Sequence, residues 1–229
     1  MSDGLTSFRV FGVPAIAVVC SLAFANVGVA ATITTTVIGT AMPWNWVSGG
    51  LNTGDHFGVN NGTTPDVISA ANGISFGPGS VLTLTYLSGM VSVGSGFPNT
   101  NTNGDTALAV NNGTGSTGQV FPSFYMNPAT YPINLGELVG TFATSSGAIV
   151  GTPFAVGIGP TALTVPTGAA QLQLGINDDF FSDNTGSYSV QIVGPAAVGV
   201  PEPSAVGLCG FGICALGLLL FKRELQMWR

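Results

Sequence analysis

A cluster of oxygen-bearing side chains lies between Asn177 and Gly186. Its potential ligands are three carboxylates and two amides: Asp178, Asp179, Asp183, Asn177 and Asn184. Residues 32–200 contain no lysine or arginine, so no fixed positive charge there pairs with these carboxylates. Like charges this close repel, and a hard cation relieves the repulsion. The alternative is an acidic turn exposed to water, in which Asp and Asn serve only the turn geometry.

Calcium is the metal that suits this cluster. It takes six to eight oxygen ligands, including backbone carbonyls, from flexible loops, which fits the cluster better than zinc or magnesium chemistry does. The spacing is not that of an EF-hand, because Phe180 stands where the second oxygen ligand is required.

Two alternating segments must position the cluster. Residues 170–176 and 187–193 each alternate apolar with polar side chains, which predicts a strand on either side of the connection. Further predicted strands share β-rich composition or flanking turns: 33–41, 68–76, 81–87, 137–142, 148–150 and 154–158. Residues 95–118 are rich in Gly, Asn, Thr and Ser and predict a long surface loop. The fold class expected is all-β, a β-sandwich or jelly roll.

Composition supports one small domain, residues 32–199, between two hydrophobic ends. The 229-residue chain is only 6% charged and holds 34 glycines and 14 prolines, which suits short strands and turns rather than helices. Residues 32–200 carry seven carboxylates without a basic residue, so nucleic acid is excluded as a partner. The three cysteines, Cys20, Cys209 and Cys214, lie outside this range, so no disulfide scaffold is expected in it.

The first 31 residues match a secretory signal peptide. Arg9 precedes a mainly apolar stretch over 10–24, and small residues end at Ala30 and Ala31, where cleavage is expected. The alternative is an uncleaved anchor helix. The signal peptide predicts that the domain is exported.

The last 30 residues form a sorting pattern. Pro201, Glu202 and Pro203 precede seventeen apolar residues, 205–221, and then the basic pair Lys222 and Arg223. Seventeen residues lie at the lower limit for spanning a bilayer, and the basic pair favours a cytoplasmic C-terminus. Residues 200–229 resemble the PEP-CTERM sorting signal. The alternative is an ordinary single-span tail anchor.

The PEP-CTERM resemblance implies a partner and a location. An exosortase would recognise the tail and cleave near the Pro-Glu-Pro motif. The protein would then be anchored transiently in the membrane before it reaches the cell surface or extracellular matrix of a bacterium.

A second resemblance covers residues 68–193. The runs 174–179 and 183–190 look like the closing segment of LecA-type calcium-dependent galactophilic lectins, and 77–84 and 88–94 resemble their earlier strand and ligand turn. Matched residue by residue, the resemblance implies the following calcium ligands: Asp178, Asp183, Asn184, the carbonyls of Val93 and Phe180, and Asp179 as an alternative to Phe180. The resemblance implies a galactose-binding-like β-sandwich whose ligand is galactose or another neutral glycan, such as an exopolysaccharide. The His-Pro loop of these lectins has no counterpart in 95–118.

Other residues suggest weaker alternatives. His56, the sole histidine, is a candidate base, but no nucleophile can be assigned to it from sequence. Trp44 and Trp46 could form a sugar platform or pack in the core. Sugar contacts from Asn99, Asn101, Asn103 and Asp105 are a further hypothesis.

Three classes of function are therefore open: a calcium-dependent carbohydrate-binding module, a structural surface or matrix protein with a stabilising calcium, and a secreted hydrolase. No catalytic pair can be selected among the seven carboxylates. A non-enzymatic protein is expected.

Overall fold

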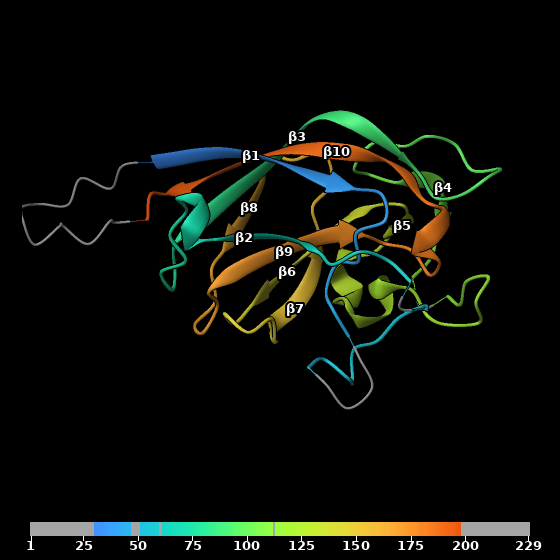
Figure 1. The fold of residues 1–229 in the computed structure, drawn as a ribbon, viewed down its shortest axis with the longest axis horizontal. Helices are drawn as coiled ribbons and strands as arrows, with labels where there is room; N and C mark the ends of the chain where they lie inside the picture. Colours follow the sequence, from blue (N-terminus) through green and yellow to red (C-terminus); the bar gives the residue numbers. More distant parts are fainter. Residues whose placement is uncertain (1–29, 47–50, 60, 112, 198–229) are drawn as a thin grey trace, which may run out of the picture.

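Two four-stranded antiparallel sheets form the body of the protein (Figure 1). The computed structural model describes residues 30–46, 51–59, 61–111 and 113–197. One sheet, called here the β10 sheet, has the order β1 (Ala30–Ile38), β10 (Thr185–Pro195), β3 (Val81–Ser92), β8 (Thr161–Thr164). The other, the β9 sheet, has the order β2 (Asp66–Ser69), β9 (Gln171–Ile176), β6 (Leu138–Ala143), β7 (Ile149–Ala155). The predicted all-β class is confirmed.

The smaller elements lie between these strands. β4 (Asp105–Ala109) pairs with β5 (Asn134–Leu135). The helical elements are single 3-10 turns: η1 (Ala70–Asn72), η2 (Pro122–Tyr125), η3 (Pro128–Thr130) and η4 (Phe181–Asp183).

The core is built from alternate residues of the two sheets. Every second side chain of β10 is fully buried from Tyr188 to Ile192, and Leu172, Leu174 and Ile176 do the same on β9. The period of two places these apolar side chains on one face of each strand. Both sets belong to one hydrophobic cluster, so the two sheets share a core.

A chain segment covers the outer face of the β9 sheet. A Cβ on Gly175 would lie 2.3 Å from the backbone carbon of Met42, so the segment that starts at Met42 touches the sheet backbone there. Trp44 and Phe57 in this segment are fully buried, with ring centroids 4.8 Å apart. Residues 42–46 and 51–57 are called the covering segment below. Both faces of β6 are buried.

Five predicted strands are confirmed, at β1, β3, β6, β9 and β10, and the other three differ. The strand predicted over 68–76 ends at Ser69, because the Ser69 hydroxyl accepts a hydrogen bond from the amide of Ala71 and begins η1. The two strands predicted at 148–150 and 154–158 are one strand, β7. Gly151 and Pro153 interrupt the apolar pattern, yet an edge strand tolerates both.

The predicted loop 95–118 was wrong in part, because it contains β4. Every residue from Thr106 to Ala109 is exposed, so this strand has no apolar face from which the sequence could reveal it. It forms by pairing with β5, where Asp105 lies opposite Leu135.

The two ends of the described body lie side by side. Ala30 pairs with Pro195, and the expected cleavage after Ala30 or Ala31 falls at the first residues of β1. The rest of the predicted signal peptide and the whole predicted sorting tail, including residues 205–221 and Pro201, Glu202, Pro203, Lys222 and Arg223, lie outside the described residues. Within the described ranges no helix is long and apolar enough to cross a membrane.

Candidate metal centre

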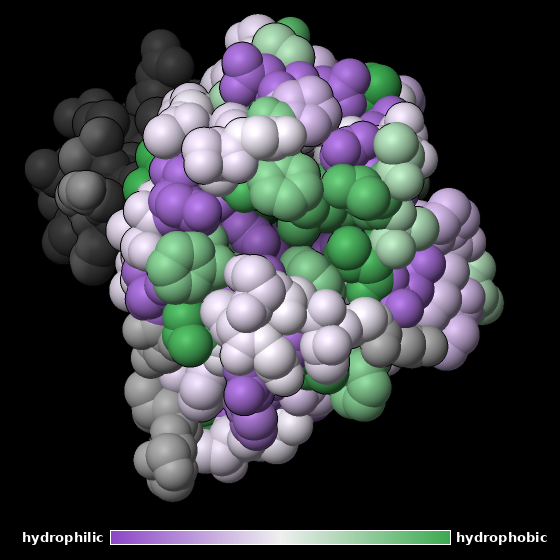
Figure 2. Space-filling view, turned by 90° about the vertical axis from the view of Figure 1, so that its right-hand side faces the viewer, coloured by the Kyte–Doolittle hydropathy of each residue, from purple (hydrophilic) through white to green (hydrophobic). Residues whose placement is uncertain are grey.

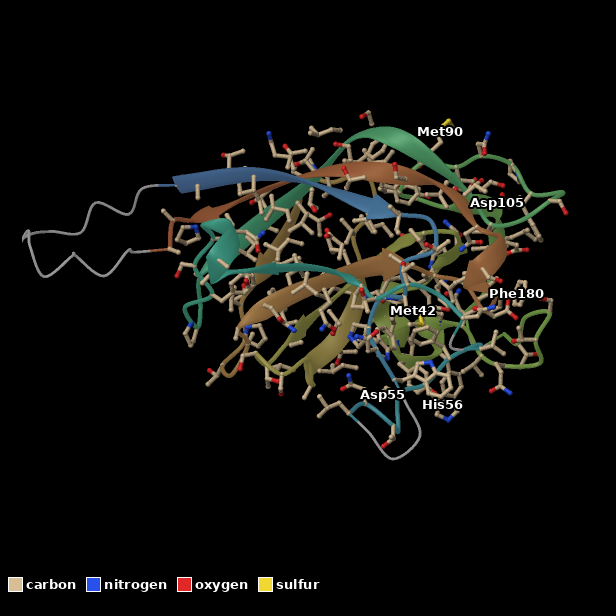
Figure 3. All side chains as sticks on the ribbon, in the orientation of Figure 1. Met42, Asp55, His56, Met90, Asp105 and Phe180 are labelled. Carbon is tan, nitrogen blue, oxygen red and sulfur yellow. The ribbon has the colours of Figure 1, made fainter. Side chains whose placement is uncertain are left out.

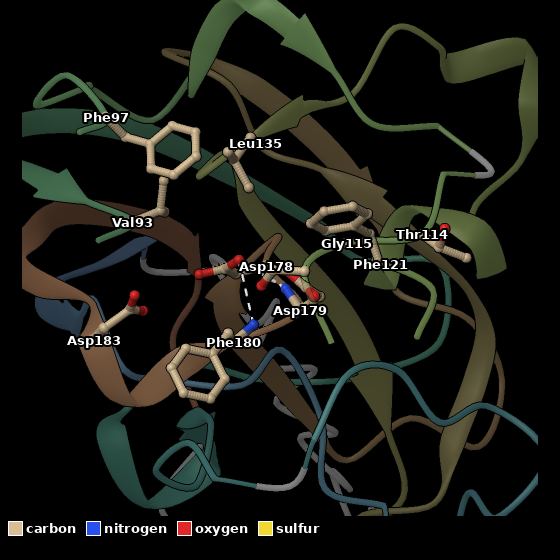
Figure 4. A pocket seen from close by; sticks show the side chains of 11 residues that line it. Val93, Phe97, Thr114, Gly115, Phe121, Leu135, Asp178, Asp179, Phe180 and Asp183 are labelled. Carbon is tan, nitrogen blue, oxygen red and sulfur yellow. Dashed lines mark hydrogen bonds between the residues drawn. The ribbon is translucent and has the colours of Figure 1, made fainter. Parts of the chain in front are cut away.

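A pocket of about 260 Å³ opens where the β9–β10 connection meets the turn after β3. It lies at the end of the molecule away from Ala30 and Pro195, and Figure 2 looks onto this end, where apolar and polar side chains surround a hollow. Phe180, labelled in Figure 3, belongs to this end. The pocket brings together Asp178, Asp183, Val93, Phe180 and Asp179 (Figure 4). These are five of the six residues predicted as calcium ligands.

Asp178 is the most buried carboxylate of the pocket, with 3% of its surface exposed. Its Oδ1 accepts hydrogen bonds from the amides of Asp179, at 2.7 Å, and Phe180, at 3.4 Å (Figure 4). Its Oδ2 is buried and has no hydrogen-bond partner among the described residues. Burial, together with the nearby charge of Asp179, raises the pKa of Asp178 to about 7. The site therefore holds an oxygen that lacks a compensating positive charge.

Asn184, the sixth predicted ligand, adds a second oxygen of this kind. It is 5% exposed, and its amide nitrogen donates to the carbonyl of Gly39 at 2.9 Å. Its Oδ1 is also buried, and nothing in the described chain donates to it. The Asn184 side chain lies near enough to the Asp178 carboxylate to lower its pKa in part. Asp178 and Asn184 thus each hold a buried acceptor without a donor in the described chain, and a cation would satisfy such oxygens.

Asp183 is held against the turn after β3. A Cβ on Gly94 would lie 2.5 Å from Oδ2 of Asp183, so the carboxylate packs directly on the glycine. Gly94 has φ of 106°, in the left-handed region that favours glycine. Val93, whose carbonyl is a predicted ligand, immediately precedes it. Sequence reasoning missed Gly94, although its place after Val93 in a Gly-rich turn was the available signal.

Asp179, unlike Asp178, is hydrogen-bonded to a neighbouring loop. Its Oδ2 accepts hydrogen bonds from the amide and the hydroxyl of Thr117, both at 2.8 Å. A Cβ on Gly115 would lie 1.9 Å from Asp179 Cγ, so only glycine permits this approach. Asp179 therefore anchors residues 113–118 to the pocket, whereas Asp178 keeps a free oxygen.

A metal ion bound here would need more ligands than acidic side chains supply. Among the described residues no group of three or more His, Cys, Asp or Glu side chains is placed to hold a metal ion. A metal here would need the amide of Asn184 and backbone carbonyls besides Asp178 and Asp183. Such mixed oxygen coordination is typical of calcium.

Apolar side chains form the rest of the pocket. Phe97 and Phe180 are 43% and 37% exposed at its rim, and Phe121 and Leu135 are buried beneath them. A ligand entering the pocket meets both carboxylates and aromatic surface. This combination suits a ring with hydroxyl groups and an apolar C–H face.

The weaker candidates have structural roles. Trp44 is fully buried and donates its indole N–H to the carbonyl of Asp55, so it belongs to the core rather than to a sugar platform. Trp46 is half-buried and packs on His56 with ring centroids 4.8 Å apart. Nδ1 of His56, shown in Figure 3, is buried without a partner in the described ranges, so the His–carboxylate pair of a catalytic relay is not formed there.

The predicted loop contacts to sugar are also engaged elsewhere. The side-chain oxygen of Asn101 accepts from the amide of Asn103, and that of Asn103 accepts from the amide of Ile158. Asp105 accepts from the amide of Ala107 on its own strand. Asn99 is exposed. Of these contacts, the one between Asn103 and Ile158 ties the loop to the body of the protein.

A scan against known protein-family models and a search of curated proteins both found no match to this chain.

Proposed function

We propose that this protein is an exported, calcium-dependent carbohydrate-binding protein of the bacterial cell surface or extracellular matrix. The observation that carries the proposal is a pair of buried oxygens, on Asp178 and Asn184. Neither oxygen has a hydrogen-bond partner among the described residues. Asp178, Asp183, Asn184 and the carbonyls of Val93 and Phe180 would hold the calcium ion. Calcium accepts further oxygens, so hydroxyls of a neutral glycan, galactose-like by the lectin resemblance, would complete its coordination.

The proposal also includes the type of β-sandwich, which we take to be a jelly roll. Successive strands alternate between the two sheets at most connections, as they do in a jelly roll. We take the body as a jelly roll of the lectin type on this support.

The two ends of the chain complete the proposal. The N-terminal segment would direct export, and the exosortase would process the tail after Pro195. The adjacency of Ala30 and Pro195 supports this arrangement, because both processing segments would leave the body at the end opposite to the pocket.

Calcium binding is tested by calorimetric titration of the full-length protein in a detergent without a sugar headgroup. Wild type should bind one calcium ion, and Asp183→Asn should weaken binding at least tenfold. Asp55→Asn is the matched control, because it removes a carboxylate that does not line the pocket. The absence of calcium binding in wild type would overturn the proposal.

Sugar binding is tested on a glycan array with calcium and with chelator. Retention of a neutral glycan only with calcium supports the lectin function. Calcium-dependent stabilisation without any retained glycan would instead identify a structural surface protein.

A further inference from the structure

A second pocket, of about 200 Å³, lies on the outer face of the β9 sheet. Its lining comes from the covering segment, the β6–β7 turn and β9: Asn45, Leu51, Asn52, Ser146, Gly147 and Gln173. It shares no lining residue with the candidate metal centre. It is therefore a separate site.

The side-chain amide of Gln173 lines this pocket and has an oxygen without a hydrogen-bond donor among the described residues. Gln173 points away from the shared core, because its neighbours Leu172 and Leu174 face inward. It is nevertheless only 3% exposed, and its Oε1 has no hydrogen-bond partner within the described parts of the chain. The side chain lies against the turn, since its Nε2 is 3.5 Å from the position of a Cβ on Gly147. A buried acceptor of this kind is destabilising until a donor reaches it.

The wall of the pocket is built rigidly. Asn52 adopts φ of 59°, the left-handed region that a residue other than glycine seldom occupies. Its Nδ2 donates to the carbonyls of Asn45, at 3.1 Å, and Gly147, at 3.0 Å. Its Oδ1 accepts from the amide of Ile149 at 2.9 Å. Asn52 thereby ties the covering segment to the β6–β7 turn, and the pocket is formed before any ligand arrives.

The chemistry of the lining selects a neutral ligand. Its described side chains are amides, one hydroxyl and the exposed apolar surface of Leu51, and none of them is charged. An anion would find no lysine or arginine anywhere in residues 32–200. The volume exceeds that of one water but lies below that of pockets for drug-sized ligands.

The geometry points to a second, calcium-independent binding site for one unit of a neutral saccharide, with a ligand hydroxyl donating to Oε1 of Gln173. The same ring would present its C–H face to Leu51. This inference does not depend on calcium. If both sites take units of one polymer, their combined affinity rises through effective concentration.

The test is saturation-transfer NMR of the full-length protein in chelator, again in a detergent without a sugar headgroup. The probes are galactose, glucose, mannose and N-acetylglucosamine, each used singly. Wild type should give transfer to at least one of them. Gln173→Leu should weaken this binding at least tenfold without lowering the melting temperature, because it removes the unpaired oxygen but keeps the volume.

Two further variants control the result. Gln171→Leu changes the same face of β9 outside the pocket lining and should bind as wild type does. Ser146→Tyr fills the mouth from an exposed turn position and should abolish binding. Failure of wild type to bind any probe, equal binding by Gln173→Leu, or preference for a blocked Gly-Asn dipeptide would each overturn the inference. Transfer seen only with calcium would also overturn it and would leave the proposed calcium-dependent function standing.

Discussion

At the scale of single residues, Asp178 and Asp179 show how neighbours of one type take different roles. Both are buried, but the amide and hydroxyl of Thr117 satisfy Asp179, whereas one oxygen of Asp178 has no partner in the described structure. The difference depends on residues 113–118, which are remote in sequence. The sequence predicted that these side chains lie together, but which aspartate keeps an unpaired oxygen follows only from the folded contacts.

Replacing Asp178 by Asn should have two opposite effects. Its folded pKa of about 7 exceeds the ordinary value of 3.8, so its contribution to stability is present at low pH and is lost as pH rises through 7. In chelator at pH 8, Asp178→Asn should therefore raise the free energy of unfolding by on the order of 2 kcal/mol. It should also weaken calcium binding at least tenfold.

Urea unfolding in chelator and calcium titration at pH 8 measure the two effects. Asp105→Asn, which alters a half-buried carboxylate outside the pocket lining, should show neither. A variant that is destabilised in chelator would show that Asp178 is not an uncompensated charge in the metal-free protein.

Glu137 should make the protein less stable as pH rises. It is buried at the start of β6, accepts a hydrogen bond from the amide of Asn134, and has a pKa raised by burial from 4.5 to about 7. Its stabilising contribution is complete below pH 4.5 and is lost as pH rises through 7, by ~3 kcal/mol in all.

Glu137→Gln keeps the accepting oxygen and should remove this part of the pH dependence. The measurement is the free energy of urea unfolding at pH 5 and pH 8 in chelator. Identical slopes for wild type and variant would show that Glu137 ionises normally.

At the scale of elements, the turn after β3 sets the position of Asp183. Gly94→Ala should disturb it, because the new Cβ would lie 2.5 Å from Asp183 Oδ2. Gly96→Ala is a close control, since Gly96 has φ of 99° against 106° for Gly94 but has open space around its Cβ position. Both variants should lose about 1 kcal/mol of stability from the left-handed backbone, but only Gly94→Ala should weaken calcium binding.

Urea unfolding and calcium titration of the Gly94→Ala and Gly96→Ala variants separate the effect of backbone strain from the effect of the contact with Asp183. Equal calcium affinity in the two variants would remove Asp183 from the ligand set.

The sequence predicted the strands whose side chains alternate between apolar and polar. It missed the short strands that form by pairing with a neighbouring strand. β9 and β10 have a strict period of two because one face of each enters the shared core. β8 has only four residues and relies on pairing with β3, so its sequence carries too short a pattern. The covering segment was missed because its apolar residues, such as Trp44 and Phe57, follow neither helical nor strand periodicity. Gln173 lies on the polar side of the alternating segment 170–176, and its burial, with 3% of its surface exposed, follows only from the folded structure.

At the scale of the whole molecule, the pocket and the chain ends lie at opposite ends of β10. The protein can be captured on a surface through one new, biotinylated cysteine after the native cysteines are replaced by Ala. Glycan binding by the captured protein should then depend on where this cysteine lies. Capture through Thr164→Cys, an exposed site paired with Val81 near the chain ends, should leave calcium-dependent glycan binding intact. Capture through Ser116→Cys, at the pocket, should block it.

Surface plasmon resonance with a glycan found on the array measures both captures. Equal glycan responses from the two orientations would contradict the placement of the binding site.

The position of Asp183 and Asn184 directly before β10 has a mechanical consequence. Eleven residues of one continuous strand connect these side chains to Pro195, beyond which the proposed tail begins. A pull on a ligand bound at the pocket would travel along this covalent backbone to the tail. β1 and β3 hold the strand on either side and would not have to peel away for the tension to pass. A protein tethered in this way would carry the force on its ligand through peptide bonds. The non-covalent contacts of the bound calcium would then be the first to dissociate under force.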